Sequence, residues 1–196
     1  MTNIIEGSGI FFWPLLICSF TAIFIIIERL IALRQSRIIP RGIYESFIKG
    51  EIPQNSNRSV SERIFNFYQD NTPDIEQLKA YARLEISRME RGLFLLDIVV
   101  TAAPLIGLLG TVTGLIQVFA NVSPDTGMPD PDIFVRGIAL ALTTTMLGLS
   151  IAIPALVGNS YLNRRIDFLE AQINVGVERL TDLIKQHSQE SKRKKK

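Results

Sequence analysis

The 196-residue chain contains a single cysteine, a single histidine and a single tryptophan. Cys18 has no second cysteine to pair with, so an internally disulfide-stapled domain is excluded. One histidine, His187, without a cysteine cluster argues against a His- and Cys-rich metal site, and we expect neither a metal nor a cofactor. The net charge of +2 is too small to indicate a nucleic-acid partner.

Basic residues are missing from long stretches of the chain. Of 21 lysines and arginines, 20 fall within residues 29–91 and 164–196, and Arg136 is the one exception. A basic side chain at the centre of a bilayer costs about 2.5–3.5 kcal/mol on insertion scales, whereas a soluble domain of this size scatters its charges. The segregation therefore indicates an integral membrane protein.

Three apolar runs are long enough to cross a hydrocarbon core of about 30 Å. We predict transmembrane helices at residues 10–31, 93–120 and 134–162. The first is expected to be retained, because residues 1–9 lack the basic segment of a signal peptide. Glycine and proline are frequent in the second and third, as membrane helices tolerate.

The basic residues also predict the orientation. The loop at residues 121–133 holds three acidic residues and no basic one, and residues 1–9 carry only Glu6, so both are expected outside and the basic segments inside. The expected parts are an outer N-terminus, three spans, an inner helical loop, an outer loop, an inner helix and a basic tail that contacts lipid or fixes topology. In chain order they are residues 1–9, 10–31, 32–92, 93–120, 121–133, 134–162, 163–187 and 188–196.

Helix signals recur in the basic segments. Ser59 and Glu62 have the spacing of a capping box, and Thr72 before Pro73 predicts a second helix start. Beyond the third span a heptad-like apolar spacing predicts a packed helix over residues 163–187, whereas the polar residues 188–196 predict disorder. We expect an all-α protein whose second and third spans extend inward.

Small residues form a stripe on each of the last two spans. Such stripes let helix backbones approach closely, and packing alone is a sufficient explanation for them. Pro104 and Pro154 are expected to kink the two helices. The predicted packing positions are Gly107, Gly110, Gly114, Ala141, Gly148 and Ala152.

Hydroxyl groups lie near the expected middle of the same two spans. Thr111 and Thr145, with Thr144 as a weaker candidate, can form a polar lining for ions or water. The alternative is that each hydroxyl only bonds to the carbonyl four residues earlier in its own helix. The sequence by itself leaves both interpretations open.

Ionisable groups are absent at that depth. Glu28, Asp97 and Arg136 lie at span edges, where they are cheap anchors. A proton relay requires an ionisable group inside the membrane, so another chain must supply one if this protein conducts protons. No Gly-x-Ser-x-Gly motif, intramembrane Asp pair or phosphate-loop lysine is present, which argues against an enzyme.

Residues 103–116, APLIGLLGTVTGLI, and 137–155, GIALALTTTMLGLSIAIPA, resemble the second- and third-span motifs of the MotA/TolQ/ExbB proton-channel family. Three spans are closer to its ExbB/TolQ branch. The resemblance implies a bacterial inner-membrane homopentamer whose second and third spans line a pore around an ExbD/TolR-type single-span partner carrying an intramembrane Asp. Thr111 and Thr145 match the family's pore threonines, and a TonB- or TolA-like protein would receive the work.

One position departs from the family pattern. Leu140 stands where many ExbB and TolQ members carry Glu, which puts an iron-siderophore or Tol role in doubt. The leading hypothesis is a proton-channel subunit of an inner-membrane motor. The alternative is a non-conducting membrane scaffold, in which the small-residue stripes serve packing alone.

Overall fold

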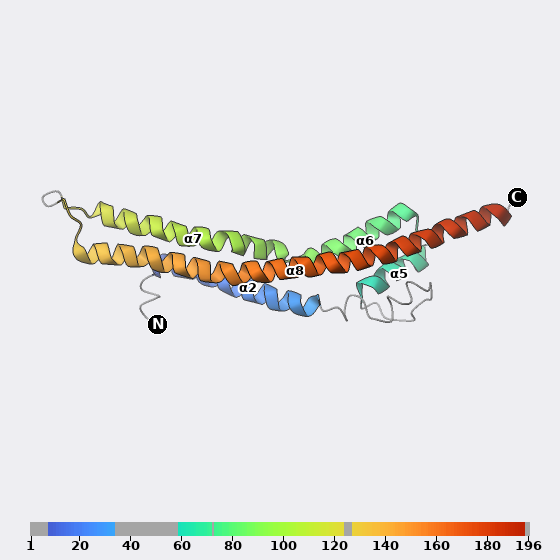
Figure 1. Cartoon of the computed structure of the whole chain (residues 1–196), viewed down its shortest axis with the longest axis horizontal. Coiled ribbons are helices and arrows are strands. Elements are labelled where there is room, and N and C mark those ends of the chain that lie inside the picture. Colours follow the sequence, from blue (N-terminus) through green and yellow to red (C-terminus); the bar gives the residue numbers. More distant parts are fainter. Residues whose placement is uncertain (1–7, 34–58, 72, 124–126, 195–196) are drawn as a thin grey trace. The chain divides into compact units, whose positions relative to one another are not determined.

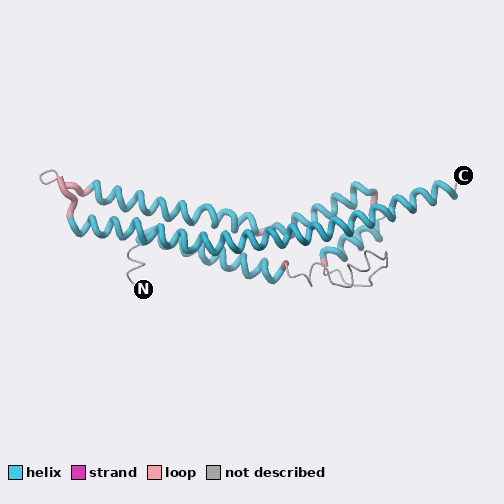
Figure 2. The backbone as a smooth tube through the Cα atoms, in the orientation of Figure 1, coloured by secondary structure: helices cyan, strands magenta, loops and turns pink. Residues whose placement is uncertain are grey.

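The computed structural model describes residues 8–33, 59–71, 73–123 and 127–194, and Thr72 and the other residues outside these ranges are not discussed further. The described chain consists of helices joined by loops and turns (Figure 2), with one isolated bridge between Val122 and Pro129. It divides into two compact units. The first comprises residues 1–28 and 92–161, and the second comprises residues 29–91 and 162–196.

Three helices build the first unit, and each carries a candidate membrane span. A short 3-10 turn, η1 (Gly9–Phe11), leads into α2 (Phe12–Ala32). Helix α7 spans Leu93–Ala120, and α8 begins at Pro131 and continues to Lys194 in the second unit. Within the first unit, α2 and α7 both lie along the first part of α8 (Figure 1). The three predicted spans are therefore present as helices.

Local chemistry sets the ends of α7 and α8. Gly92 has a φ of 88°, a left-handed conformation that glycine adopts at no steric cost, so the chain turns there before α7. At the start of α8 the backbone N–H of Asp132 donates to Asp130 Oδ1 at 2.8 Å. Pro131, which has no N–H to satisfy, takes the first helical position. Helix α8 thus starts three residues before the predicted span.

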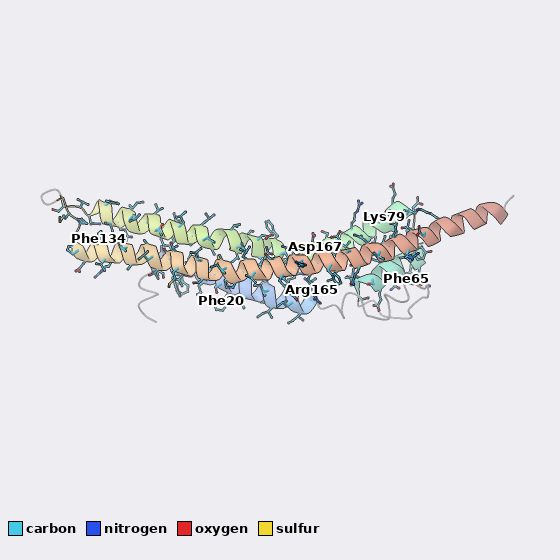
Figure 3. The ribbon with its side chains drawn as sticks, viewed as in Figure 1. Phe20, Phe65, Lys79, Phe134, Arg165 and Asp167 are labelled. Atoms are coloured by element: carbon cyan, nitrogen blue, oxygen red, sulfur yellow. The ribbon has the colours of Figure 1, made fainter. Side chains whose placement is uncertain are left out.

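Large apolar side chains cover the outer surface of the first unit. Trp13, Phe20 and Phe24 of α2 are 66–70% exposed, and Phe119 of α7 is 71% exposed. Phe20 and Phe134 stand on the helices' surfaces in Figure 3. An apolar surface of this extent is unstable in water and stable in lipid, where helices satisfy their own backbone hydrogen bonds.

The second unit contains α5 (Val60–Asn71), α6 (Ile75–Glu90) and the remainder of α8. The predicted capping box at the start of α5 is confirmed, since Ser59 N–H donates to Glu62 Oε2 at 3.1 Å and Glu62 N–H donates to Ser59 Oγ at 3.2 Å. Helix α6 is capped by Asp74, whose N–H donates to Gln77 Oε1 at 3.1 Å, and not by the predicted Thr72. Asp74 and Gln77 together supply the reciprocal bonds of a capping box at this helix start.

The apolar residues with heptad-like spacing in the C-terminal part of α8 form a buried stripe. Its members are at most 5% exposed: Leu162, Ile166, Leu169, Ile173, Val177 and Leu180. Arg165 lies on the same stretch and donates from Nε to the carbonyl of Leu33 at 3.0 Å. The helix continues to Lys194, so the predicted disorder from residue 188 is wrong for residues 188–194. Nothing terminates α8 earlier, because residues 177–194 contain neither glycine nor proline.

Candidate functional site

The two longest apolar helices of the first unit, α7 and α8, meet along a seam of small residues. A Cβ atom on Gly114 would collide with the carbonyl oxygen of Gly137, and one on Gly148 would lie 2.6 Å from the carbonyl oxygen of Ala103. Since real Cβ atoms do not come so close to backbone, these glycines permit the helices to approach each other directly. The six predicted packing positions, Gly107, Gly110, Gly114, Ala141, Gly148 and Ala152, are all buried.

Helix α2 completes this packing. Leu15 of α2, Ala103 of α7 and Ala152 of α8 form one buried cluster, which Cys18, Ile106, Leu147 and Ile151 border. Gly158 faces the end of the Ile26 side chain, where an added Cβ would lie 2.7 Å from Cδ1. Helix α2 therefore packs against α7 and α8 beside the seam.

Thr144 lies inside the seam and has no exposed surface. Its hydroxyl lies 2.8 Å from the carbonyl of Leu140, 3.1 Å from that of Ala141 and 3.3 Å from that of Gly107 on the facing helix. A Cβ on Gly110 would collide with the same side chain. Association with other chains can only bury a residue further, so Thr144 joins the two helices and does not line a surface.

Thr111 and Thr145 lie at the edge of the seam, where each is partly exposed. The hydroxyl of Thr145 donates to the carbonyl of Gly107 at 3.4 Å, and that of Thr111 donates to the carbonyl of Leu108 at 2.6 Å. Gly107 and Thr111 are one turn apart on α7, so both hydroxyls lie on the same flank of the seam. With their protons directed to carbonyls, the hydroxyl oxygens retain lone pairs that can accept from water or a hydrated proton.

Leu140 lies on a different side of α8. Its Cδ1 would lie 3.7 Å from a Cβ atom on Gly9, so its side chain faces the start of α2 and not the flank with the two threonines. A glutamate at this position would also face that side of the helix. The Leu140 side chain is therefore not part of the flank that carries Thr111 and Thr145.

Both helices continue through their internal prolines. Pro104 lies within α7 and Pro154 within α8. Each proline lacks the N–H that would bond to the carbonyl four residues earlier, so the carbonyls of Val100 and Ser150 lose their usual helix donors. Because the Ala103 carbonyl of α7 lies against Gly148 of α8, Val100 and Ser150 are at nearly the same level, and their carbonyls add acceptor capacity at that one end of the seam.

One pair of polar residues was not predicted. Asn159 of α8 is 6% exposed and donates from Nδ2 to Oδ1 of Asp97 on α7 at 2.5 Å. From the sequence Asp97 is expected to be an anchor at the span edge, whereas in the structure its carboxylate accepts a hydrogen bond from the neighbouring helix. A signal was present, because Asp97 precedes Thr111 by 14 residues and Asn159 follows Thr145 by the same number. Antiparallel helices bring such positions to one level.

The fold and this seam define a class of protein: an all-helical, multi-pass membrane protein of the channel and transport type. The chain belongs to the MotA/TolQ/ExbB proton channel family, which matches residues 41–175, more than half of its length. This membership confirms the resemblance of the two span motifs. It also makes the chain an inner-membrane protein of a family of transporters and channels, not of enzymes.

Two relatives place the chain in the ExbB branch of the family. It is 28% identical to the biopolymer transport protein exbB1 of Vibrio cholerae over 185 residues, which cover 86% of this chain and 81% of that relative. It is 36% identical to the biopolymer transport protein ExbB of Helicobacter pylori over 100 residues, which cover 50% of this chain and 68% of that relative.

Proposed function

We propose that this chain is the proton-conducting subunit of an inner-membrane motor that couples the proton-motive force to work across the cell envelope. The observation that carries the proposal is the flank of the α7/α8 seam, where Thr111 and Thr145 supply hydroxyls. At their level the described helices of the first unit hold no carboxylate, histidine or lysine. The path is therefore polar but incomplete, as expected of one component of a two-component channel.

The missing group would come from a partner. By analogy with the family, it is an ExbD/TolR-type protein with a single span and an intramembrane aspartate. Copies of this chain would surround it as a homopentamer, with α7 and α8 facing the pore. The basic segments would lie inside, and the N-terminus and the loop at residues 121–133 outside.

The work would pass to a TonB- or TolA-like protein that reaches across the periplasm. One proton crossing 100 mV supplies about 2.3 kcal/mol, so a mechanical step would need several protons.

Replacing the two hydroxyls tests the proposal. We expect Thr111→Val and Thr145→Val each to lower proton uptake at least tenfold in vesicles that hold the chain with its single-span partner, because valine keeps the shape and removes the oxygen. Thr111→Ser and Thr145→Ser are the matched controls and should conduct. Size-exclusion chromatography should show unchanged assembly for all four variants. Normal uptake in both valine variants would contradict the role given to the hydroxyls.

A non-conducting scaffold is the second candidate, favoured by the complete burial of Thr144 and the glycine contacts, which serve packing. A scaffold predicts a stable oligomer that purifies without an aspartate-bearing partner. Co-purification from native membranes distinguishes the two, because a proton channel of this design cannot conduct without that partner.

A further inference from the structure

Asp97 and Asn159 form a polar pair at the opposite end of the seam from the α7–α8 loop. The two residues come from different helices and are 62 positions apart in the chain, yet Asn159 Nδ2 lies 2.5 Å from Asp97 Oδ1. Asn159 is buried, whereas Asp97 remains exposed on α7. The amide thus fixes the position of the carboxylate, and the carboxylate keeps access to its surroundings.

Asp97 and Asn159 face each other across the two helices at positions equally far from Thr111 and Thr145. Fourteen residues separate Asp97 from Thr111 on α7 and Thr145 from Asn159 on α8, a rise of about 21 Å along each helix. Fourteen residues are also close to four full turns, so Asp97 falls within about 40° of Thr111 around the axis of α7. The carboxylate therefore lies on the flank of α7 that carries the Thr111 hydroxyl, about 21 Å closer to the N-terminal end of the helix.

Another hydroxyl lies between the two levels. Thr101 is exposed, and its Oγ1 lies 3.0 Å from the carbonyls of both Asp97 and Ile98. It is one turn beyond Asp97 in the direction of Thr111. At 100° per residue, Thr101 and Thr111 lie about 40° on either side of Asp97, so the three polar side chains share one side of α7, next to the stripe of seam glycines, with about 15 Å of helix between Thr101 and Thr111.

A membrane anchor would be arranged differently. Charged side chains at span ends extend away from the helix to reach the headgroups. Asp97 is instead bonded to a buried amide of the neighbouring helix. Glu28 of α2 is another described acidic group of the first unit toward this end, two residues beyond the Ile26 that packs on Gly158, and it lies on a different helix.

We propose that Asp97 is the proton-accepting group at the inner end of the path, with Asn159 as its positioning residue. The inference rests on the proposed function. A hydrated proton that leaves the level of Thr111 and Thr145 transfers to a carboxylate oxygen of Asp97, which becomes neutral. The acid then returns the proton to water on the inner side and regains its charge. The path thereby has a carboxylate exit on this chain, in addition to the aspartate expected from the partner.

The test measures proton uptake into vesicles that hold the whole complex, with assembly followed by size-exclusion chromatography. Asp97→Asn keeps the shape and the oxygen that accepts from Asn159, and removes only the exchangeable acid. We expect uptake to fall at least tenfold with assembly intact, and Asp97→Glu to retain most of it. Uptake at the unchanged level in Asp97→Asn would overturn the inference. Asp97→Ser repeats the measurement in case the asparagine variant does not assemble.

Asn159 requires a readout that loss of packing would not produce. Asn159→Leu should lower uptake severalfold in the unaltered chain and have no further effect in the Asp97→Asn background, because it acts through the carboxylate. An equal loss in both backgrounds would overturn the positioning role. Ser160→Leu, a change at the next position on the exposed side, is the matched control and should conduct normally.

The valine variants of Thr111 and Thr145 distinguish a wrong exit group from a wrong assignment of the hydroxyls. If they block uptake while Asp97→Asn conducts, the exit group is wrong and the channel function stands. If the valine variants conduct normally, the role given to the hydroxyls fails, whatever the result at Asp97. If the unaltered complex takes up no protons, the proposed function itself fails.

Discussion

The two units of this chain hold their helices together in different ways. In the first unit the backbones of α7 and α8 approach each other through glycines, and the contacts are made by carbonyls, Cα atoms and the Thr144 side chain. In the second unit the buried side chains include large ones such as Leu78, Leu162 and Leu169. The first unit also buries large side chains, at Leu15 and Leu96, so the direct approach of backbones through glycines is what distinguishes it. Such an approach suits lipid, because lipid gives no hydrophobic gain for burying leucine between helices, and water does.

The two units also differ in the polar groups that link their helices. Glu85 of α6 has no exposed surface and accepts from two arginines. Arg63 of α5 donates to its Oε2 through Nε at 2.9 Å and Nη2 at 2.6 Å, and Arg88 donates to Oε1 at 2.6 Å. The carboxylate thus links α5 to α6. In the first unit the corresponding interhelix bonds come from the hydroxyls of Thr144 and Thr145, which both donate to the Gly107 carbonyl, and from the pair of Asp97 with Asn159.

The largest effect is expected from removing the buried carboxylate. Glu85→Ala leaves two arginines without their shared acceptor and should lower the free energy of unfolding by about 3 kcal/mol, the lower end for a broken buried ion pair because both arginines reach water. Denaturation in detergent measures the loss, and hydrogen exchange should quicken in α5 and α6 and not in α7. Exchange rising equally in both units would contradict their separate stabilisation. Lys79→Ala, which breaks the exposed pair with Glu178, is the control and should cost less than 1 kcal/mol.

A smaller effect is expected from one methyl group in the seam. In Gly114→Ala the new Cβ meets the Gly137 carbonyl, which is backbone and cannot move aside, so we expect about 2 kcal/mol of destabilisation. Gly158→Ala is the matched control, since its Cβ meets the end of the flexible Ile26 side chain and should cost less than 1 kcal/mol. Denaturation of the purified protein compares the two. Equal losses would show that backbone approach is not what stabilises the first unit.

The smallest effect distinguishes neighbouring threonines. Thr144→Val removes the interhelix hydroxyl contact and should destabilise the first unit by about 1 kcal/mol without lowering proton uptake. Thr145→Val should do the reverse, with little loss of stability and a strong loss of uptake. Stability and uptake measured side by side check this pair. A loss of uptake in Thr144→Val with normal assembly would mean that burial does not exclude this residue from the path.

Local signals predicted much of the fold. The second span was predicted at residues 93–120, the bounds of α7, because Gly92 and the Pro- and Gly-containing loop after Asn121 interrupt the helix on either side. Ser59 and Glu62 formed the expected capping box. The start of α6 was misplaced because Thr72 and Asp74 both suit a helix N-terminus, and only Asp74 has a glutamine three residues later.

Other features depended on contacts that one helix cannot reveal. Successive residues of an α-helix are 100° apart around its axis, so Thr143, Thr144 and Thr145 point in three different directions. The sequence alone did not show which of them faces α7. Only the packing against Gly107 and Gly110 buries Thr144 and leaves Thr145 at the edge. Likewise the bond of Asn159 to Asp97 requires the antiparallel register of α7 and α8.

The sequence by itself determined that this is a membrane protein with three apolar helices, because the cost of placing charge in lipid separates basic and apolar residues along the chain. It also determined which spans can approach closely, since only small residues permit it. The tertiary structure decided which polar side chain each helix turns inward and which it leaves on the flank. That choice depends on helix rotation and register, and these are set by contacts between α7 and α8 that no local stretch of sequence contains.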